Sequence, residues 1–417
     1  MYGTLALQPK VLDEYRRIAG DAPIDEIKRR AETLRGLRVL HLSVTAFGTG
    51  VAELLNSAVP LLADAGLDCQ WQVVRPTDEF ASCSKALYRS LAGISQEWSE
   101  ELSKTWLSYS AMNAELLTDA FDVIIVHDPQ PAAIRSFAPE AARRNTRWVF
   151  HSHLDLSGAQ TAAWLALREH IKDYDALVFD AESFVHEDMP DVPLTIIPPA
   201  IDPLGPRNME LPPDTVKDVL LHYGIDPQRP LISQLSPCDP SCDFLGCMDI
   251  YDRVAAQTPG VQLAIIAASP PEDPASIDHF DAAVRRSMEY TDVHILRGTD
   301  EVGNVETNAL QRASSVVIQK GLRKGFGLWI SDALWKARPV VTAKDGGLSH
   351  QVIDGQTGLI ADTVDEFAEC ITRLLRDPGL ARRLGEAGRR HVQEHFLLPR
   401  LVIDELRLLG QLVGARR

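Results

Sequence analysis

The stretch that most constrains the fold runs from residue 315 to residue 361. It starts with a short apolar run at 316–318, continues through a glycine-containing loop, and enters residues 328–336, whose apolar side chains recur at helical spacing. A second apolar run at 340–341 is followed by Gly346-Gly347 and another helical pattern. Two successive strand–loop–helix units of this kind are typical of a parallel sheet.

The same alternation of strand and helix patterns covers most of the chain. We expect strands at 38–42, 70–74, 123–126, 148–150, 176–179, 194–197, 231–235, 263–267, 293–296, 316–318, 340–341 and 359–360. A chain of 417 residues is too long for one ordinary core, and prolines near residues 198–213 suggest a linker. We therefore expect an N-terminal helical extension at 1–36, α/β domains at 37–205 and 215–385, and C-terminal helices at 386–417.

Composition excludes several classes of partner. The net charge of −16 argues against nucleic acid and anionic membranes, because both attract concentrated positive charge. The sequence shows neither an N-terminal targeting pattern nor a long apolar span, so we expect a cytoplasmic protein without a membrane partner. Cys238, Cys242 and Cys247 cluster, but they lack paired C-x-x-C spacing and a nearby histidine, so we expect no metal.

Polar and glycine residues follow several predicted strands of the first half. Gly48-Thr49-Gly50 follows the first strand, and it is either a tight turn or a loop whose amides approach a phosphate or sugar. The segments 127–131 and 151–155 each follow a strand and contain histidine and aspartate. They are either helix caps or the walls of one shared pocket, since parallel strands end at the same edge of a sheet.

These motifs support a resemblance to a known family. Lys324-Gly325-Phe326-Gly327, Asp332, Gly346-Gly347 and the motif at 354–358 resemble the signature of retaining GT-B glycosyltransferases of family 4. Residues 48–53, 127–133, 153–157, 198–203 and 333–336 narrow the resemblance to the glycosyltransferring trehalose synthases. The resemblance implies a GT-B fold, in which two Rossmann-like α/β domains, here 37–205 and 215–385, face each other across a cleft. In that fold the C-terminal helices at 386–417 cross back onto the first domain.

The resemblance also implies an activity and a set of site residues. Its members transfer glucose from a nucleotide-activated donor to free glucose with retention, so it implies small sugar substrates, an NDP-sugar donor, no metal cofactor and a possible homodimer. The implied catalytic residues are His153, Lys324 and Asp155. The implied donor-binding residues are Gly48, Gly50, Gly325, Phe326, Gly327, Leu328 and Asp332. The implied acceptor-binding residues are His127, Asp128, Gln130 and Asp155.

Two departures from the family pattern fall at the donor phosphates. Relatives carry an arginine and a lysine in the loop that corresponds to residues 236–243, where this chain has Pro237 and Cys242. One group that stabilises such a charge contributes roughly 10²–10³ in rate. Lys324 replaces the first acid of the family's pair, with Lys320 and Arg323 close by in sequence.

Three hypotheses fit these departures. In the first, the chain is a glycosyltransferase with an atypical donor site, in which Lys324, with Lys320 or Arg323, neutralises the phosphate. In the second, it is a pseudo-glycosyltransferase that joins aminosugar or cyclitol units. In the third, it is a non-catalytic homologue that binds sugars or a partner subunit. Retained polar groups at the strand ends of the first domain favour an enzyme.

Overall fold

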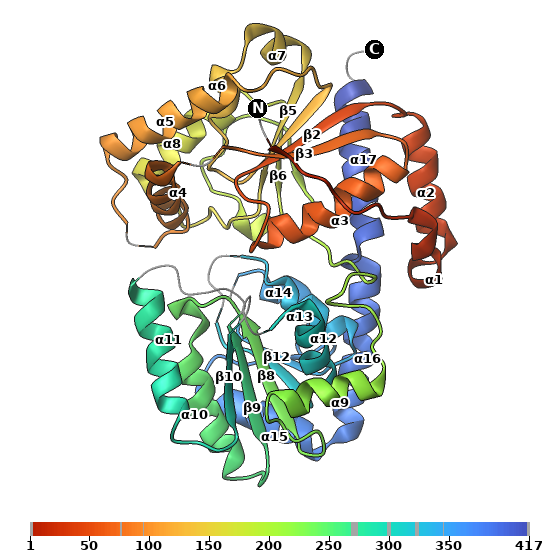
Figure 1. The fold of residues 1–417 in the computed structure, drawn as a ribbon, viewed down its shortest axis with the longest axis vertical. Helices are drawn as coiled ribbons and strands as arrows, with labels where there is room; N and C mark the ends of the chain where they lie inside the picture. Colours follow the sequence, from red (N-terminus) through yellow and green to blue (C-terminus); the bar gives the residue numbers. More distant parts are fainter. Residues whose placement is uncertain are drawn as a thin grey trace. The chain divides into compact units, whose positions relative to one another are not determined.

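The computed structural model describes residues 3–75, 77–94, 96–267, 274–297, 302–321, 325–344 and 346–414. The chain forms two compact units, each an α/β unit built on one sheet (Figure 1). Unit 1 consists of Met1–Ala200 and Leu398–Arg417, and unit 2 consists of Ile201–Leu397. Within the described ranges, no helix combines the length and apolarity needed to cross a membrane.

The sheet of unit 1 has the strand order β1-β3-β2-β4-β5-β6-β7. Its strands are β1 (Gly3–Thr4), β2 (Arg38–Ser43), β3 (Asp68–Val73), β4 (Val123–His127), β5 (Arg147–Ser152), β6 (Ala176–Phe179) and β7 (Leu194–Ile196). All neighbouring strands are parallel except β1, which pairs antiparallel with β3. The residues of β4 and β6 are buried along their whole length, as expected for parallel strands covered by helices on both faces.

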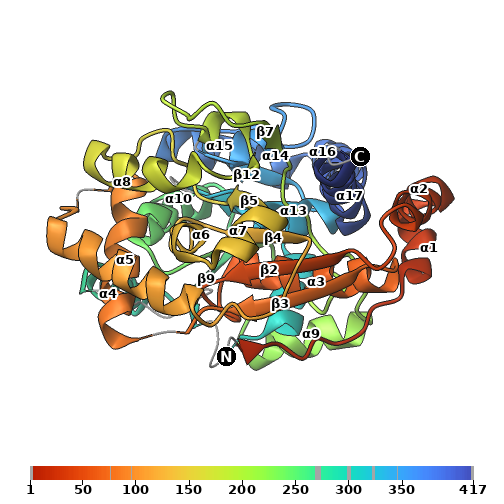
Figure 2. The same cartoon turned by 90° about the horizontal axis from the view of Figure 1, so that it is seen from above.

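Helices cover both faces of this sheet and its edge. They are η1 (Leu12–Tyr15), α1 (Arg16–Ala19), α2 (Asp21–Glu32), α3 (Gly50–Asp64), α4 (Asp78–Leu91), α5 (Glu100–Ala114), α6 (Ile134–Phe137), α7 (Glu140–Asn145), α8 (Thr161–Ile171), η2 (Glu182–Phe184) and α17 (Leu398–Gly414). Helix α17 packs against α2 and α3, and Arg407 on α17 pairs with Glu26 on α2 at 2.9 Å. Helices α4, α5 and α8 group together away from α17 (Figure 2).

The sheet of unit 2 is parallel throughout, with the order β10-β9-β8-β11-β12-β13. Its strands are β8 (Leu231–Ser236), β9 (Gln262–Ala267), β10 (Val293–Arg297), β11 (Val316–Gln319), β12 (Val340–Thr342) and β13 (Leu359–Ile360). Its helices are α9 (Pro213–His222), η3 (Pro240–Cys242), α10 (Phe244–Ala255), α11 (Pro274–Ser287), α12 (Asn304–Ala313), α13 (Leu328–Trp335), α14 (Leu348–Gln351), α15 (Val364–Arg376) and α16 (Pro378–His395).

The predicted α/β fold is confirmed, because every predicted strand overlaps an observed strand. Strand β1 is not among the predicted strands, because its two residues are too few for an apolar pattern. The predicted N-terminal helical segment is interrupted at Gly20, whose φ of 84° ends α1 and precedes α2. Pro60 does not interrupt α3, which extends without a break to Asp64.

Candidate functional site

The candidate site of unit 1 lies at the carboxyl ends of three neighbouring strands. His127 ends β4, Asp128 follows it, His153 follows β5, and Asp180 follows β6. Register places His127 beside His151 and Ser152 beside Phe179, so these ends are adjacent. Ligands of parallel α/β sheets bind at this edge.

Asp128 is held in an unusual backbone conformation. Its φ is 68°, a left-handed value that few residues other than glycine adopt. Its amide donates to the carbonyl of His151 at 2.8 Å, and its Oδ1 accepts from the amide of His153 at 2.9 Å. Burial raises the pKa of Asp128, while the nearby His153 opposes that rise. Such backbone conformations concentrate at functional sites. Here the conformation places the Asp128 carboxylate against the His153 amide in the loop after β5.

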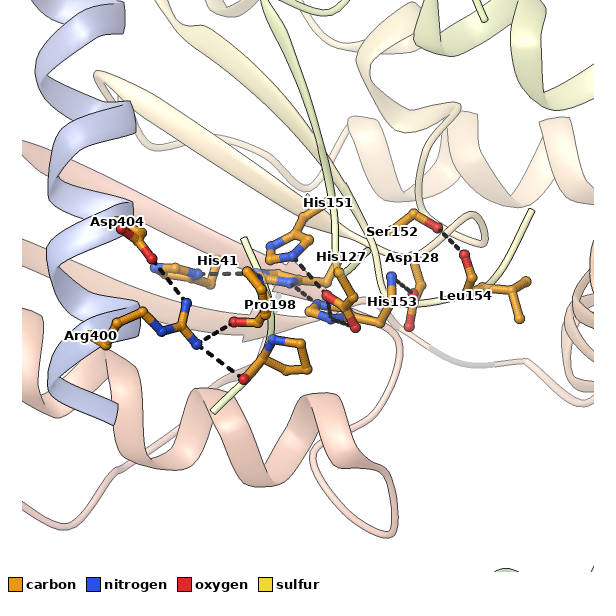
Figure 3. A network of polar contacts seen from close by, with 12 residues as sticks. His41, His127, Asp128, His151, Ser152, His153, Leu154, Pro198, Arg400 and Asp404 are labelled. Carbon is orange, nitrogen blue, oxygen red and sulfur yellow. Dashed lines mark hydrogen bonds and ion pairs between the residues drawn. The ribbon is translucent and has the colours of Figure 1, made fainter. Parts of the chain in front are cut away.

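Three histidines form one hydrogen-bonded row (Figure 3). His41 Nδ1 lies 3.1 Å from His127 Nε2, and His127 Nδ1 lies 3.0 Å from His153 Nε2. The planes of the His41 and His127 rings differ by 19°, and those of His127 and His153 by 9°. The rings are therefore nearly parallel and joined through their nitrogens.

A carboxylate lies at each end of this histidine row. At one end, His153 Nδ1 lies 3.0 Å from Asp180 Oδ1 and 3.2 Å from Asp180 Oδ2. At the other end, His41 Nε2 lies 3.2 Å from Glu405 Oε1, an ion-pair distance without the angle of a direct hydrogen bond. These two atoms border a cavity of about 20 Å³, which has room for about one water molecule.

Glu405 belongs to α17, and Arg400 ties the start of that helix to the segment after β7 (Figure 3). Arg400 Nη2 donates to the carbonyls of Pro198 at 2.6 Å and Pro199 at 3.1 Å. Its Nη1 pairs with Asp404 at 2.9 Å. These contacts hold α17 where Glu405 meets His41.

His127, His151 and His153 differ in pKa because their electrostatic surroundings differ. Burial lowers the pKa of His127 well below its ordinary range, and burial together with the charge of His153 lowers the pKa of His151 to about 4. Burial alone would also lower the pKa of His153, but the Asp180 carboxylate overrides it and raises that pKa to about 9. Burial opposes ionisation of Asp180 too, yet His153 and His151 hold its pKa below the ordinary value.

His127, His151 and His153 each offer a nitrogen, and these nitrogens lie within 4.8 Å of one another. That spacing is compatible with a metal ion. However, the nitrogens of His127 and His153 face each other at 3.0 Å within nearly coplanar rings. Lone pairs directed along a line between two nitrogens suit a shared proton, whereas metal ligands converge on a point beside that line. The geometry is that of a hydrogen-bonded row.

The remaining expected residues of unit 1 occupy nearby loops. Asp155 accepts hydrogen bonds from the amide and hydroxyl of Ser157, at 2.9 and 2.6 Å. The main-chain carbonyl of Gln130 accepts from Trp106, and its side-chain Oε1 is buried without a hydrogen bond to the described residues. Gly48 has a φ of 73°, and Gly50 begins α3, so the glycine pair stands at a helix N-terminus.

The glycine loop of unit 2 lies between β11 and α13. Gly327 has a φ of 74° and caps α13, and Leu328 begins that helix. Phe326 is buried, and a side chain at Gly347 would come within 2.4 Å of its Cα. Gly325 accepts a hydrogen bond from the amide of Gly347 at 3.1 Å. The expected donor-site residues Gly325 to Leu328 therefore form one packed turn with Gly347.

Asp332 lies inside unit 2 with only 2% of its surface exposed. Its Oδ1 accepts from Asn208 Nδ2 at 2.7 Å, and its Oδ2 lies 3.9 Å from Arg207. Lys336, on the same helix, is also buried and donates to Asn208, Gln311 and the carbonyl of Asp332 at 2.9–3.0 Å. The acid expected at the donor ribose is thus engaged with the protein itself.

The phosphate-loop segment 236–243 contains two carboxylates and no arginine or lysine. Asp239 caps η3 through the amide of Ser241, and Asp243 caps α10 through the amide of Gly246. Asp243 also pairs with Lys320 at 2.7 Å. Lys320 is therefore already neutralised by an acid of this loop. Arg323 and Lys324 lie outside the described residues.

Sequence reasoning missed Asp180, His41 and Glu405. Asp180 directly follows the predicted strand at 176–179, so the rule that selected His127 and His153 could also have selected it. His41 lies inside an apolar strand, and Glu405 lies in a helix near the end of the chain. Their alignment with the site depends on tertiary packing.

Comparisons with known proteins agree with this architecture. Residues 41–186 match the family model described as "Trehalose synthase, N-terminal domain", and residues 292–391 match "Glycosyl transferases group 1". A trehalose synthase of Rubrobacter xylanophilus is 38% identical over 97% of this chain and 98% of its own length. A trehalose synthase of Thermococcus litoralis is 35% identical over 96% of this chain and 97% of its own.

Solved structures show the same fold. A UDP-forming α,α-trehalose-phosphate synthase from Burkholderia xenovorans, solved in complex with glucose-6-phosphate, matches with a TM-score of 0.72 at 15% identity. The match covers 90% of this chain and all of that one. At this identity the likeness concerns the fold, which is the predicted GT-B fold of two Rossmann-like units. The near full-length relatives above 30% identity establish more: this chain belongs to the trehalose synthase family of glycosyltransferases.

Proposed function

We propose that this protein transfers a sugar from a nucleotide-activated donor to a sugar or sugar-like acceptor, with retention of the anomeric configuration. In such a step the bond between the anomeric carbon and the phosphate oxygen breaks, and a bond to the acceptor oxygen forms. The proton of the acceptor hydroxyl goes to the departing diphosphate. No metal ion is needed for this balance.

One observation carries the proposal. Asp128, expected on the acceptor side, and His153, expected to be catalytic, are fixed together at one strand edge, where the Asp128 carboxylate accepts from the His153 amide at 2.9 Å and Asp180 lies 3.0 Å from the His153 ring. A buried polar cluster costs more to maintain than an apolar one, so its presence at a strand edge where ligands of parallel α/β sheets bind supports a retained role. We assign acceptor binding to this edge, with Asp128, Gln130 and Asp155 as contacts.

A donor site of altered chemistry is part of the proposal. Asp243 neutralises Lys320, which the first hypothesis offered as a phosphate partner. Asp332, which the family pattern places at the donor ribose, is buried against Asn208. Retaining transfer requires charge stabilisation on the leaving phosphate. We therefore assign that task to Lys324 and to the amides at the α13 N-terminus, where the helix dipole favours an anion.

The pairing of Asp243 with Lys320 also favours a second candidate, in which the protein binds sugars without ordinary transfer. A panel of nucleotides, NDP-sugars, sugar phosphates, sugars, aminosugars and cyclitols in a thermal-shift assay separates the two candidates, because ligands of the native state raise its apparent stability. Hits are then incubated in donor and acceptor pairs with EDTA, and products are identified by NMR. A disaccharide with the donor's anomeric configuration supports the proposal. Binding of sugars without any product supports the second candidate.

A further inference from the structure

The histidine row leaves two buried polar atoms without a hydrogen-bond partner when its three imidazoles are neutral. Three hydrogen bonds connect Asp180, His153, His127 and His41, and a fourth contact of 3.2 Å brings His41 Nε2 to Glu405 Oε1, neither of which has a hydrogen-bond partner among the described residues. One proton between the two atoms of each contact is needed if no contact is to hold two facing acceptors. Three neutral imidazoles carry three ring protons, one each. If both carboxylates are ionised, one contact is left with two facing lone pairs. A buried contact of that kind is costly, so the row favours a fourth proton.

We propose that the row from Asp180 to Glu405 holds one proton more than three neutral imidazoles carry, and that this proton makes His153 an imidazolium at the acceptor edge. His153 then donates to Asp180 and to His127, His127 donates to His41, and His41 donates toward Glu405. All four contacts are filled. The extra proton offsets one of the two buried carboxylate charges.

A second arrangement of the same protons fills the same contacts. If the proton between His153 and His127 moves to His127, and the proton between His127 and His41 moves to His41, the positive charge passes from His153 to His41. Atoms and charge balance, and no proton enters or leaves. Each shift spans a nitrogen–nitrogen distance of 3.0 or 3.1 Å. The row therefore connects α17, through Glu405, with the charge state of the site.

The surroundings place the charge on His153. The Asp180 carboxylate is hydrogen-bonded to Nδ1 of His153, and the Asp128 carboxylate accepts a hydrogen bond from the main-chain amide of His153. Burial keeps His127 and His151 neutral by lowering their pKa values, whereas Asp180 raises the pKa of His153. The charged and titratable groups around the row are Asp128, Asp180, His151, Arg400, Glu405 and Cys69.

In the proposed reaction, Asp180, His127, His41 and Glu405 are positioning residues that act through His153. Both ring nitrogens of His153 are bonded to protein groups, so its ring contributes a fixed positive charge and not a proton to the sugar. That charge stabilises an acceptor oxygen as it loses its proton. This catalytic use rests on the proposed function, whereas the protonation of the row does not.

The test is a pH titration of the full-length chain labelled with ¹⁵N-histidine, because nitrogen shifts distinguish an imidazolium from each neutral tautomer. The row resonances are identified by their loss in His127→Gln and His153→Gln. We expect one row histidine to stay doubly protonated well above pH 6.5, and His127 and His41 to carry their proton on Nε2. Because the sites are coupled, the titration belongs to the whole row.

Variants at the two carboxylates test the coupling. Glu405→Gln keeps an oxygen acceptor for His41 but removes one negative charge, so the imidazolium should deprotonate about one pH unit lower. Asp180→Asn should lower the pH at which the imidazolium deprotonates still further, because it removes the negative charge in direct contact with His153. The matched control is Glu140→Gln on α7, which makes the same change at an exposed residue paired with Arg144 and should leave the row titration unchanged.

Three results would overturn the proposal. One is a row of only neutral histidines at pH 7. Another is a Glu405→Gln titration identical to that of the unmodified protein, which would show that the two ends are not coupled. The third is displacement of the row resonances by stoichiometric Zn²⁺, which would make the nitrogens metal ligands. If the imidazolium is found in a protein without transfer activity, the proposed function is refuted and the proposed protonation of the row is supported.

Discussion

The ring of His153 and the carboxylate of Asp180 form a buried pair, with Nδ1 of the histidine 3.0 Å from Oδ1 of the aspartate. The two residues follow the neighbouring strands β5 and β6. Asp180 is 2% exposed, so solvent screens the pair weakly. The pair connects the pH dependence of the protein with the chemistry of its site.

The pair should make stability fall as the pH rises. Asp180 raises the pKa of His153 from 6.5 to about 9, so the folded protein binds this proton more tightly than the unfolded chain. The stabilisation is complete below pH 6.5 and is lost between pH 6.5 and about 9. Denaturant unfolding over this range measures it. Asp180→Asn should lose about 3–5 kcal/mol at pH 6 and much less at pH 9.5, and an equal loss at both would contradict the charge pairing.

Asp243→Asn should strengthen the binding of nucleoside diphosphates. The change releases Lys320, 2.7 Å away, to face an anion, and asparagine tolerates the residue's φ of 46° and its helix-capping role. We expect the Kd to fall roughly 5- to 50-fold, as for one newly available charge-assisted contact. Asp239→Asn is the control, because it removes the same charge from the same loop without releasing Lys320. Equal effects of the two variants in calorimetry would show that only net charge matters.

Gly50→Ala should lower substrate use without unfolding unit 1. A side chain at Gly50 meets no atom within 4 Å, and alanine is a better helix former than glycine at the start of α3. If the amides at this helix N-terminus approach a ligand, the added methyl group should raise KM or lower kcat/KM by about tenfold or more. Gly414→Ala, at the open end of α17, is the control for helix propensity. Unchanged kinetics in Gly50→Ala would assign Gly48-Thr49-Gly50 to a structural turn.

Lys336 should make stability rise with pH. Burial lowers its pKa from 10.5 to about 7, so the unfolded chain binds more protons between pH 7 and 10.5, and the free energy of unfolding increases over that range. This increase opposes the decrease from His153. Lys336→Met should abolish it and leave its oxygen partners unpaired, at about 1–3 kcal/mol for each group that water cannot reach. The same pH slope in Lys336→Met would place the titration elsewhere.

Lys324→Glu should abolish donor binding or transfer if Lys324 neutralises the phosphate. The prediction comes from the sequence, which places Lys324 directly before Gly325-Phe326-Gly327 and the α13 N-terminus, and the substitution replaces attraction by repulsion. The family residue at this position is acidic, so the substitution suits the fold. Lys217→Glu, at an exposed residue of α9, serves as a control for net charge. Undiminished or increased activity in Lys324→Glu would remove Lys324 from the mechanism.

The sequence by itself determined the strands, the turns and the strand ends that form the candidate site. Apolar runs such as 123–126 and 316–318 predicted β4 and β11, and glycines predicted turns where Gly48 and Gly327 adopt positive φ. These features depend on residues close in the chain, so local patterns contain them. His127, Asp128 and His153 were predicted for the same reason, because each follows a strand.

Only the tertiary structure decided how these residues are used. Sheet order brings Asp180 to His153, and the packing of α17 brings Glu405 to His41, although helix and strand lie near opposite ends of the chain. The same is true of unit 2, where Asp332 meets Asn208 and Lys320 meets Asp243. A charged or polar side chain has no local pattern that names its partner. Its role depends on which groups folding places within about 3 Å, because hydrogen bonds form only over that distance.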